Sequence, residues 1–144
     1  MSDEHDNVPD ADRRSDEEWR SALTPEQYRV LRQHATEPPW SHPYNTEHRR
    51  GRYVCAGCGA ALFSSDTKFN SGSGWPSYFE AFDSAVETTV DHAYGMVRVE
   101  MHCRRCGGHL GHIFDDGPEP TGKRYCTNGM SLKFEPDETP DRQP

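Results

Sequence analysis

The chain of 144 residues is poor in hydrophobic residues, which make up 32% of it. Its mean hydropathy is −1.02. No apolar run approaches the roughly 20 residues that a membrane-spanning helix needs. The N-terminus is acidic and has no apolar stretch, so it does not look like a secretory signal. These absences predict a small hydrophobic core, a cytoplasmic location and no membrane partner.

The chain also has little excess of positive charge anywhere. Residues 1–18 carry eight acidic and two basic side chains, and residues 135–144 carry four and one, whereas residues 19–134 hold 13 basic and 12 acidic ones. A near-neutral body lacks the basic surface that phosphate binding requires, which argues against a nucleic-acid partner. We predict disordered acidic tails at 1–18 and 136–144 around a single domain at 19–135.

Cysteine is scarce, but four of the five cysteines form two C-x-x-C pairs, each followed by glycine. Two such pairs can supply four thiolates to one tetrahedral zinc ion. Redox-active dithiols are the alternative, but they require a pair that opens a helix in a βαβ unit, and neither pair has that context. A structural zinc contributes about 10–16 kcal/mol, as much as the whole stability of a typical domain. We therefore predict one structural zinc, on which folding depends, at Cys55, Cys58, Cys103 and Cys106.

The fifth cysteine, Cys126, is left without a partner. A spare thiol in a reducing compartment is either a small buried hydrophobe or a nucleophile. Arg124 and Asn128 stand two residues to either side, so an extended strand would point all three side chains to one face. One well-placed cation or two hydrogen bonds can lower the pKa of a thiol from about 8.5 to about 7. These neighbours alone leave both interpretations open.

One helix is expected before the cysteine pairs. Thr24 and Gln27 form a capping box with Pro25 in the first helical position, and the helix should run to about His34. Pro38 and the proline after it end it. From Tyr53 onward, alternating patterns and turn residues predict short strands. They are expected at 77–82, 85–90, 95–103, 112–114, 125–127 and 131–134, which indicates a small, mainly β, antiparallel domain.

Two more segments carry candidate site residues. His109 and His112 follow the second cysteine pair directly and could serve as general acids. They could equally be surface histidines, or a second metal site that is short of ligands. Trp75 follows the glycine-rich Ser-Gly-Ser-Gly segment, where a tryptophan belongs either to the core or to the wall of a binding site.

These segments together resemble methionine-R-sulfoxide reductases of the MsrB type. The similar stretches are 67–77, 106–117 and 120–128, in the family's order and together with both cysteine pairs. The resemblance extends over about residues 36–134. It implies a fold of two antiparallel sheets, one zinc at the four paired cysteines, and an oxidoreductase that repairs oxidised methionine.

The resemblance also assigns roles to individual residues. It implies that Cys126 is the nucleophile, that Arg124 supports its thiolate and that Trp75 receives the methyl group of the substrate. His109, His112 and Asn128 would line the site. The preference for the R epimer comes from the resemblance alone, because the residues do not distinguish R from S.

The implied chemistry agrees with the residues. The Cys126 thiolate attacks the sulfoxide sulfur while a histidine protonates the oxygen, and Cys126 becomes a sulfenic acid that a thiol must reduce. The expected partners are oxidised proteins or peptides, and thioredoxin or a small thiol as the reductant. The free amino acid is a further candidate substrate, and a monomer is expected.

The sequence departs from the family pattern at a few positions. Ser73 stands where many members have a resolving cysteine, so recycling should need an external thiol. Gly129 and Met130 replace a small polar residue and alanine, and Trp40 replaces phenylalanine. These three changes could reshape the pocket without removing a catalytic group.

Two other functions compete with this interpretation. A non-catalytic zinc module that binds a protein or nucleic acid would explain the cysteine pairs, but it gives no role to Cys126, Trp75 or the two histidines. A cysteine hydrolase would use Cys126 with His109 or His112 as its base. Assays of a Cys126→Ser protein on methionine sulfoxide and on esters would separate the three functions.

Overall fold

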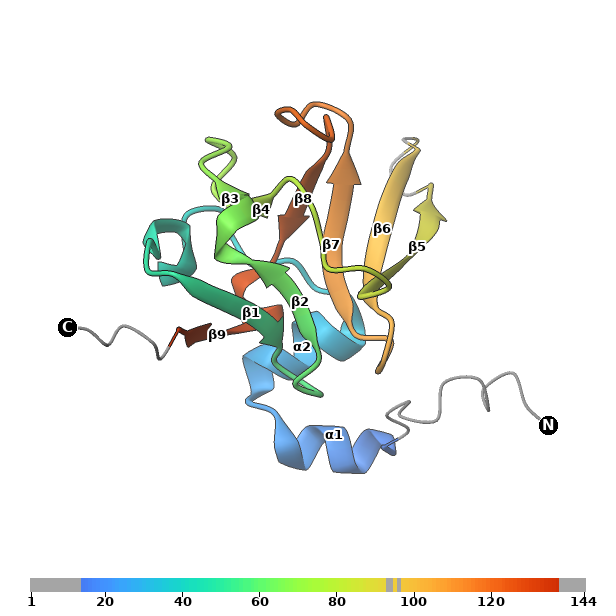
Figure 1. Ribbon diagram of the computed structural model, residues 1–144. Coiled ribbons are helices and arrows are strands. Elements are labelled where there is room, and N and C mark those ends of the chain that lie inside the picture. Colours follow the sequence, from blue (N-terminus) through green and yellow to red (C-terminus); the bar gives the residue numbers. More distant parts are fainter. Residues whose placement is uncertain (1–13, 93–94, 96, 138–144) are drawn as a thin grey trace.

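The computed structural model describes residues 14–92, 95 and 97–137. Within this part of the chain, two α-helices accompany two antiparallel sheets (Figure 1), which confirms the mainly β fold that the sequence predicted. The helices are α1 (Asp16–Ala22) and α2 (Pro25–Gln33). The strands are β1 (Gly51–Cys55), β2 (Ala61–Ser64), β3 (Lys68–Phe69), β4 (Ser77–Tyr78), β5 (Val86–Asp91), β6 (Arg98–Cys103), β7 (His109–Phe114), β8 (Arg124–Thr127) and β9 (Leu132–Pro136). Short 3₁₀ turns are η2 (Pro43–Thr46), η3 (Ser65–Thr67) and η5 (Gly129–Ser131).

The two sheets differ in size. The smaller one has the order β2-β1-β9, and the larger one has the order β3-β4-β8-β7-β6-β5. Strands β7 and β8 therefore lie in the middle of the larger sheet, and they carry four of the six predicted site residues outside the cysteine pairs. An inner strand is bonded on both sides, so its side chains are held in fixed positions.

The predicted helix is present as α2. The Thr24 hydroxyl accepts a hydrogen bond from the backbone N–H of Gln27 at 3.1 Å, and the Gln27 side chain accepts one from the N–H of Thr24 at 3.0 Å. The helix ends at His34, which adopts the left-handed conformation with φ of 60°. Such a C-terminal residue points its side chain away from the helix axis and toward the neighbouring strands.

Helix α1 was not predicted, and its first three residues belong to the segment 1–18 that was expected to be a disordered tail. A second capping box, between Ser15 and Glu18, starts this helix inside the acidic run. Acidic residues in the first turn also interact favourably with the helix dipole. Trp19 then buries its side chain against the body. Of the C-terminal tail expected at 136–144, Pro136 ends β9, and Asp137 donates its N–H to the carbonyl of Arg50 at 2.9 Å, so the tail begins later than expected. Residues 1–13 and 138–144 lie outside the described residues.

The strands expected at 85–90, 95–103, 112–114, 125–127 and 131–134 are present as β5 to β9 with shifted bounds, but one expected strand is shorter, and β2 and β3 were not predicted. The strand expected at 77–82 ends at Tyr78, because the N–H of Phe79 turns to the carbonyl of Thr67 and that of Phe82 to the carbonyl of Leu62. Strand β2 was missed because Leu62 and Phe63 are adjacent and both fully buried, so the segment shows no alternation. In the described residues, neither helix has the length and apolar character needed to cross a membrane.

The core lies between the two sheets. Tyr53 of β1, Phe63 of β2 and Tyr78 of β4 are all fully buried, and the rings of Phe63 and Tyr78 stack with their centroids 4.3 Å apart. Met101 of β6 and Leu110 of β7 complete this layer. One face of the larger sheet is thus packed against the core. This packing holds strands β7 and β8, which carry site residues, in a fixed position.

Candidate functional site

The four paired cysteines come together at one end of the molecule. Their sulfur atoms all lie within 4.8 Å of one another, with 3.6 Å between Cys55 and Cys106 and 3.6 Å between Cys58 and Cys103. A tetrahedral zinc with Zn–S bonds of about 2.3 Å places its sulfur ligands about 3.8 Å apart. Hydrogen bonds among these thiols, first of all with Cys103, raise the pKa of Cys55 and lower that of Cys58. The cluster has the spacing and chemistry to hold one zinc ion.

Glycine shapes both cysteine pairs. Gly59 and Gly107 have φ values of 83° and 77°, in the left-handed region. This conformation lets the N–H of Gly59 bond to the carbonyl of Cys55 at 2.9 Å and the N–H of Gly107 to that of Cys103 at 2.7 Å. The glycine after each pair is therefore needed for the tight turn that brings two sulfurs to one point.

Helices α1 and α2 close the cysteine cluster from outside. Arg32 of α2 donates a hydrogen bond to the carbonyl of Cys106 at 2.9 Å, and Arg14 donates one to the carbonyl of Gly57 at 2.6 Å. Both guanidinium groups lie over the ring of Trp19, at 3.9 Å for Arg14 and 4.5 Å for Arg32. A four-sulfur site enclosed in this way suits a structural ion rather than a catalytic one.

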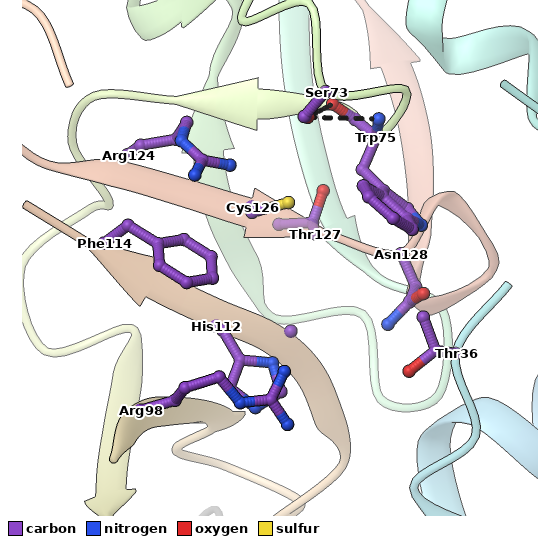
Figure 2. Close-up of a pocket in the computed structure, with 11 residues that line it drawn as sticks. Thr36, Ser73, Trp75, Arg98, His112, Phe114, Arg124, Cys126, Thr127 and Asn128 are labelled. Atoms are coloured by element: carbon purple, nitrogen blue, oxygen red, sulfur yellow. Dashed lines mark hydrogen bonds between the residues drawn. The ribbon is translucent and has the colours of Figure 1, made fainter. Parts of the chain in front are cut away.

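A separate cavity of about 250 Å³ opens on the larger sheet. Figure 2 shows the sulfur of Cys126 in it, with Arg124 and Phe114 to one side and Trp75 and Asn128 to the other. The structure thus brings together all the predicted site residues outside the cysteine cluster except His109. Its lining residues are Thr36, Ser73, Trp75, Arg98, Gly111, His112, Phe114, Arg124, Cys126, Thr127 and Asn128.

Sheet register places Cys126 between two polar neighbours. On β8 it lies directly opposite His112 of β7 and opposite Ser77 of β4. Residues paired in this way have Cβ atoms about 4.5–5.5 Å apart, within reach of a proton transfer between side chains. The hydroxyls of Ser73 and Ser77 act on the thiol electrostatically and lower its pKa. The sequence did not single out Ser77, and its position opposite Cys126 depends on strand pairing.

Burial raises the pKa of Cys126, and this effect outweighs the charge of Arg124 and the hydrogen bonds from Ser73, Ser77 and Arg124, all of which lower it. The sequence showed neighbours that could lower this pKa, but in the structure the pKa is raised instead. The difference arises because the cavity removes water from the sulfur, which cannot be read from neighbouring residues.

Arg124 is fixed at the rim of the cavity. Its guanidinium donates hydrogen bonds to the carboxylate of Asp116 at 2.8 Å and 3.2 Å, and it lies 4.4 Å from the centre of the Phe114 ring. Asp116 is exposed to solvent, and its pair with Arg124 raises the pKa of the guanidinium. The arginine therefore stays charged beside Cys126.

Trp75 and Asn128 are held by one residue that the sequence analysis missed, Glu37. The indole N–H of Trp75 donates to the backbone carbonyl of Glu37 at 2.9 Å, and the N–H of Glu37 donates to the side-chain oxygen of Asn128 at 3.0 Å. The buried Glu37 carboxylate accepts hydrogen bonds from the N–H groups of Gly129 and the residue after it, at 2.8 Å and 2.9 Å. The only feature of the sequence that could have drawn attention to Glu37 is its place directly before Pro38.

His109 does not line the cavity. Its side chain is 3% exposed, and its Nδ1 lies 2.6 Å from Oε2 of Glu100. Burial lowers the pKa of His109 to about 4, against the charge of Glu100, which raises it. The ring of His109 lies 5.8 Å from that of His112, edge to face. The neutral His109 imidazole therefore contacts Glu100 and the ring of His112, and it does not face the cavity.

The departures from the family pattern lie mostly outside the cavity wall. Trp40 is 64% exposed and lines a different cavity, near η2. A side chain at Gly129 would meet the ring of His42 at 2.3 Å, so glycine is required there by His42. Of these residues, Ser73 alone lines the cavity beside Cys126. Trp40, Gly129 and Met130 do not line the Cys126 cavity, so they do not reshape its wall directly.

Comparison with known proteins agrees with this geometry. Residues 23–136 match the model of the SelR domain. The chain is 55% identical over 123 residues to "Peptide methionine sulfoxide reductase MsrB" of Leptospira interrogans, covering 85% of this chain and 94% of that protein. The protein of the same name from Agrobacterium fabrum is 56% identical over 124 residues, covering 85% and 92%. The one from Methanosarcina mazei is 55% identical over 126 residues, covering 87% and 90%.

Proposed function

Because the chain belongs to the SelR domain family, we propose that it is a peptide-methionine-R-sulfoxide reductase, an oxidoreductase whose nucleophile is Cys126. The observation that carries this proposal is the cavity, which is lined by the single thiol of Cys126, by His112 on the adjacent strand and by Trp75. The preference for the R epimer follows from the family. A non-catalytic zinc module would leave this constellation without a role.

The cavity suits a small, dipolar substrate such as the methionine sulfoxide side chain. Trp75 and Phe114 offer apolar faces for the methyl and methylene groups, with the methyl group against Trp75. Asn128, whose amide is held by Leu110 and Glu37, is in a position to orient the substrate. Oxidised peptides and proteins are the proposed substrates, together with the free amino acid.

Cys126 and His112 divide the chemistry between them. His112 takes the proton of the Cys126 thiol and passes it to the sulfoxide oxygen, while Arg124 stabilises the thiolate that forms. The sulfoxide S–O bond breaks and an S–O bond to Cys126 forms, so methionine gains two electrons and Cys126 becomes a sulfenic acid. His109 has a positioning role. Its contact with Glu100 fixes the His109 ring, which packs edge to face against the ring of His112.

Recycling of Cys126 requires a thiol from another molecule. The four paired cysteines belong to the zinc cluster, and Ser73 offers a hydroxyl that cannot form a disulfide. A thiol of thioredoxin, or a small thiol, attacks the sulfenic acid, releases water and forms a mixed disulfide that a second thiol resolves. We place this reaction in the cytoplasm, with the protein acting as a monomer.

The zinc ion that we assign to the four paired cysteines is structural. Four thiolates complete a tetrahedral shell and leave no position for water or substrate. The cluster joins the end of β1 at Cys55 to the end of β6 at Cys103. Its proposed role is to stabilise the sheet that carries the cavity.

The proposal is tested with the two epimers of a dabsylated methionine sulfoxide and dithiothreitol as the reductant. The wild type should convert the R epimer and leave the S epimer, and Cys126→Ser should convert neither while keeping the wild-type melting temperature. Without reductant, the intact mass should increase by one oxygen on Cys126. Turnover of esters but not of sulfoxide would instead indicate a hydrolase, and no turnover at all would support the non-catalytic module.

A further inference from the structure

Three histidines surround one glutamate outside the Cys126 cavity. His34 comes from the end of α2, Glu100 and His102 from β6, and His109 from β7. Oxygen Oε2 of Glu100 lies 2.8 Å from Nδ1 of His34, 3.2 Å from Nε2 of His102 and 2.6 Å from Nδ1 of His109. Elements far apart in the sequence thus direct imidazole nitrogens at a single carboxylate oxygen.

Three of these side chains have the arrangement of a metal site. One ligand atom from each of His34, Glu100 and His102 lies within 4.8 Å of the other two. A tetrahedral zinc with bonds of about 2.0–2.1 Å to nitrogen and oxygen holds its ligand atoms about 3.3 Å apart. The distances from Oε2 of Glu100 to the nitrogens of His34 and His102, 2.8 Å and 3.2 Å, lie near this value.

We propose that His34, Glu100 and His102 form a second metal site, which binds a divalent transition-metal cation such as Zn²⁺ or Co²⁺. Two imidazoles and one carboxylate are the donor set that zinc and its neighbours in the first transition row accept. Ca²⁺ and Mg²⁺ prefer shells made of oxygen, so they are not the expected occupants. Nothing in this site depends on Cys126 or on the reaction proposed for it.

The backbone holds these ligands in place before a cation binds. Glu100 and His102 are two residues apart on β6, so their side chains share one face of the strand. His34 caps α2 in the left-handed conformation, and its N–H bonds to the carbonyl of Arg29. His109, which contacts the same carboxylate, orients Glu100 in the way that hydrogen-bonded neighbours orient metal ligands.

This site is open to solvent, unlike the cysteine cluster. The side chain of His34 is 57% exposed, whereas those of Glu100 and His102 are 14% and 17% exposed. A cation can therefore enter from the His34 side, and three protein ligands leave a fourth position for water. The bound cation would join the end of α2 to β6, a connection that the cysteine cluster does not make.

The test is a titration of the zinc-loaded protein with Co²⁺, followed by calorimetry and optical absorption. One further equivalent should bind, with cobalt bands typical of nitrogen and oxygen ligands and without a thiolate-to-cobalt charge-transfer band. His34→Asn and His102→Gln should each weaken binding at least about tenfold. Asparagine tolerates the left-handed conformation at position 34, so this variant should keep the fold. The matched control is His48→Asn, because His48 is an exposed histidine elsewhere.

Melting temperature gives a second measurement that does not depend on spectra. Excess Zn²⁺ should raise the melting temperature of the wild type and of His48→Asn, but not that of His34→Asn, since a ligand stabilises only the state that binds it. The proposal is overturned if millimolar Co²⁺ gives no second equivalent. It is equally overturned if both site variants bind like the wild type, or if a thiolate charge-transfer band shows that the cobalt went to the cysteines.

Discussion

The cysteine cluster and the Cys126 cavity use the same chemical group in opposite surroundings. In the cluster, four sulfurs contact one another and the helices cover them. In the cavity, one sulfur faces a space of about 250 Å³, and its neighbours are hydroxyls, an arginine and an imidazole. Neighbouring groups, rather than the thiol itself, thus decide whether a cysteine binds metal or attacks a substrate.

The two regions are joined by strands β6 and β7. Cys103 ends β6, and the second cysteine pair turns the chain directly into His109 at the start of β7. Between these strands His102 pairs with His109, and Glu100 with His112. Because His112 faces Cys126 across the next pair of strands, a fixed turn at the cysteines sets the register of the cavity. The cysteine cluster therefore helps to position the side chains of the Cys126 cavity.

The largest expected effect separates the two kinds of cysteine. Cys55→Ser or Cys106→Ser should lose metal and fold together, because structural zinc contributes about 10–16 kcal/mol and a domain of this kind has about 5–15 kcal/mol of net stability. Cys126→Ser, the control, should keep the zinc of the cysteine cluster and melt like the wild type. Metal analysis and circular dichroism melts check both. A metal-free Cys55→Ser protein with an unchanged melting temperature would refute the structural role.

The next effect distinguishes the two histidines of the His-Leu-Gly-His segment. His112→Asn should lower kcat/KM for the R epimer by about 10²-fold or more, because it removes the group that moves the proton. His109→Asn should slow turnover less, and should lower the free energy of unfolding by about 1–3 kcal/mol, since Glu100 loses a buried hydrogen bond. Steady-state kinetics and urea unfolding of both variants test this order. If both keep the wild-type rate across neutral pH, the proton comes from another group.

These two predictions show what the sequence could and could not provide. Spacing alone predicted that the four paired cysteines come together, and the period of a strand placed Arg124, Cys126 and Asn128 together, as their shared cavity shows. Patterns of this kind depend only on residues that lie close together in the sequence, so they can be recognised without the structure. They also fixed the start and end of α2.

The contacts that the sequence could not provide join distant segments. Glu37 reaches Asn128 and the turn after it, 91 residues along the chain, and nothing in its local sequence indicates these partners. The burial of His109 likewise depends on Glu100 and on the stacked ring of His34, from another element. The raised pKa of Cys126 has the same origin, since desolvation is a property of the closed cavity. Long-range packing decided each of these features.

A smaller effect concerns how the oxidised Cys126 is reduced back to the thiol. One equivalent of sulfoxide without reductant should give the wild type a trappable sulfenic acid on Cys126, no intramolecular disulfide and no zinc release. Ser73→Cys should instead form a disulfide with Cys126, because Ser73 lines the same cavity and its hydroxyl lowers the pKa of that thiol. Peptide mapping after alkylation detects both products.

The matched control for this variant is Ser71→Cys. The hydroxyl of Ser71 bonds to those of Ser73 and Ser77, at 2.8 Å and 2.9 Å, and it does not line the cavity. A thiol there should form the disulfide more slowly or not at all. A bridge between Cys126 and any of the zinc cysteines in the wild type would show that the cluster takes part in recycling, contrary to the division between the two regions.

The smallest effect is on the acidity of the Cys126 thiol, measured as its rate of alkylation by iodoacetamide against pH. Only the thiolate reacts, so the rate increases as pH rises through the pKa. Burial has raised that pKa, so in the wild type the increase should lie above the ordinary thiol value of about 8.5. Arg124→Gln removes the charge that most lowers the pKa, and it should move the increase further toward alkaline pH. Asp116→Asn leaves the arginine in place without its carboxylate partner, and because that pair is exposed to solvent the shift should be smaller and toward lower pH. An Arg124→Gln profile that stays in place or moves toward acid would mean that Arg124 does not stabilise the thiolate, and that the hydroxyls of Ser73 and Ser77 are the groups that oppose burial.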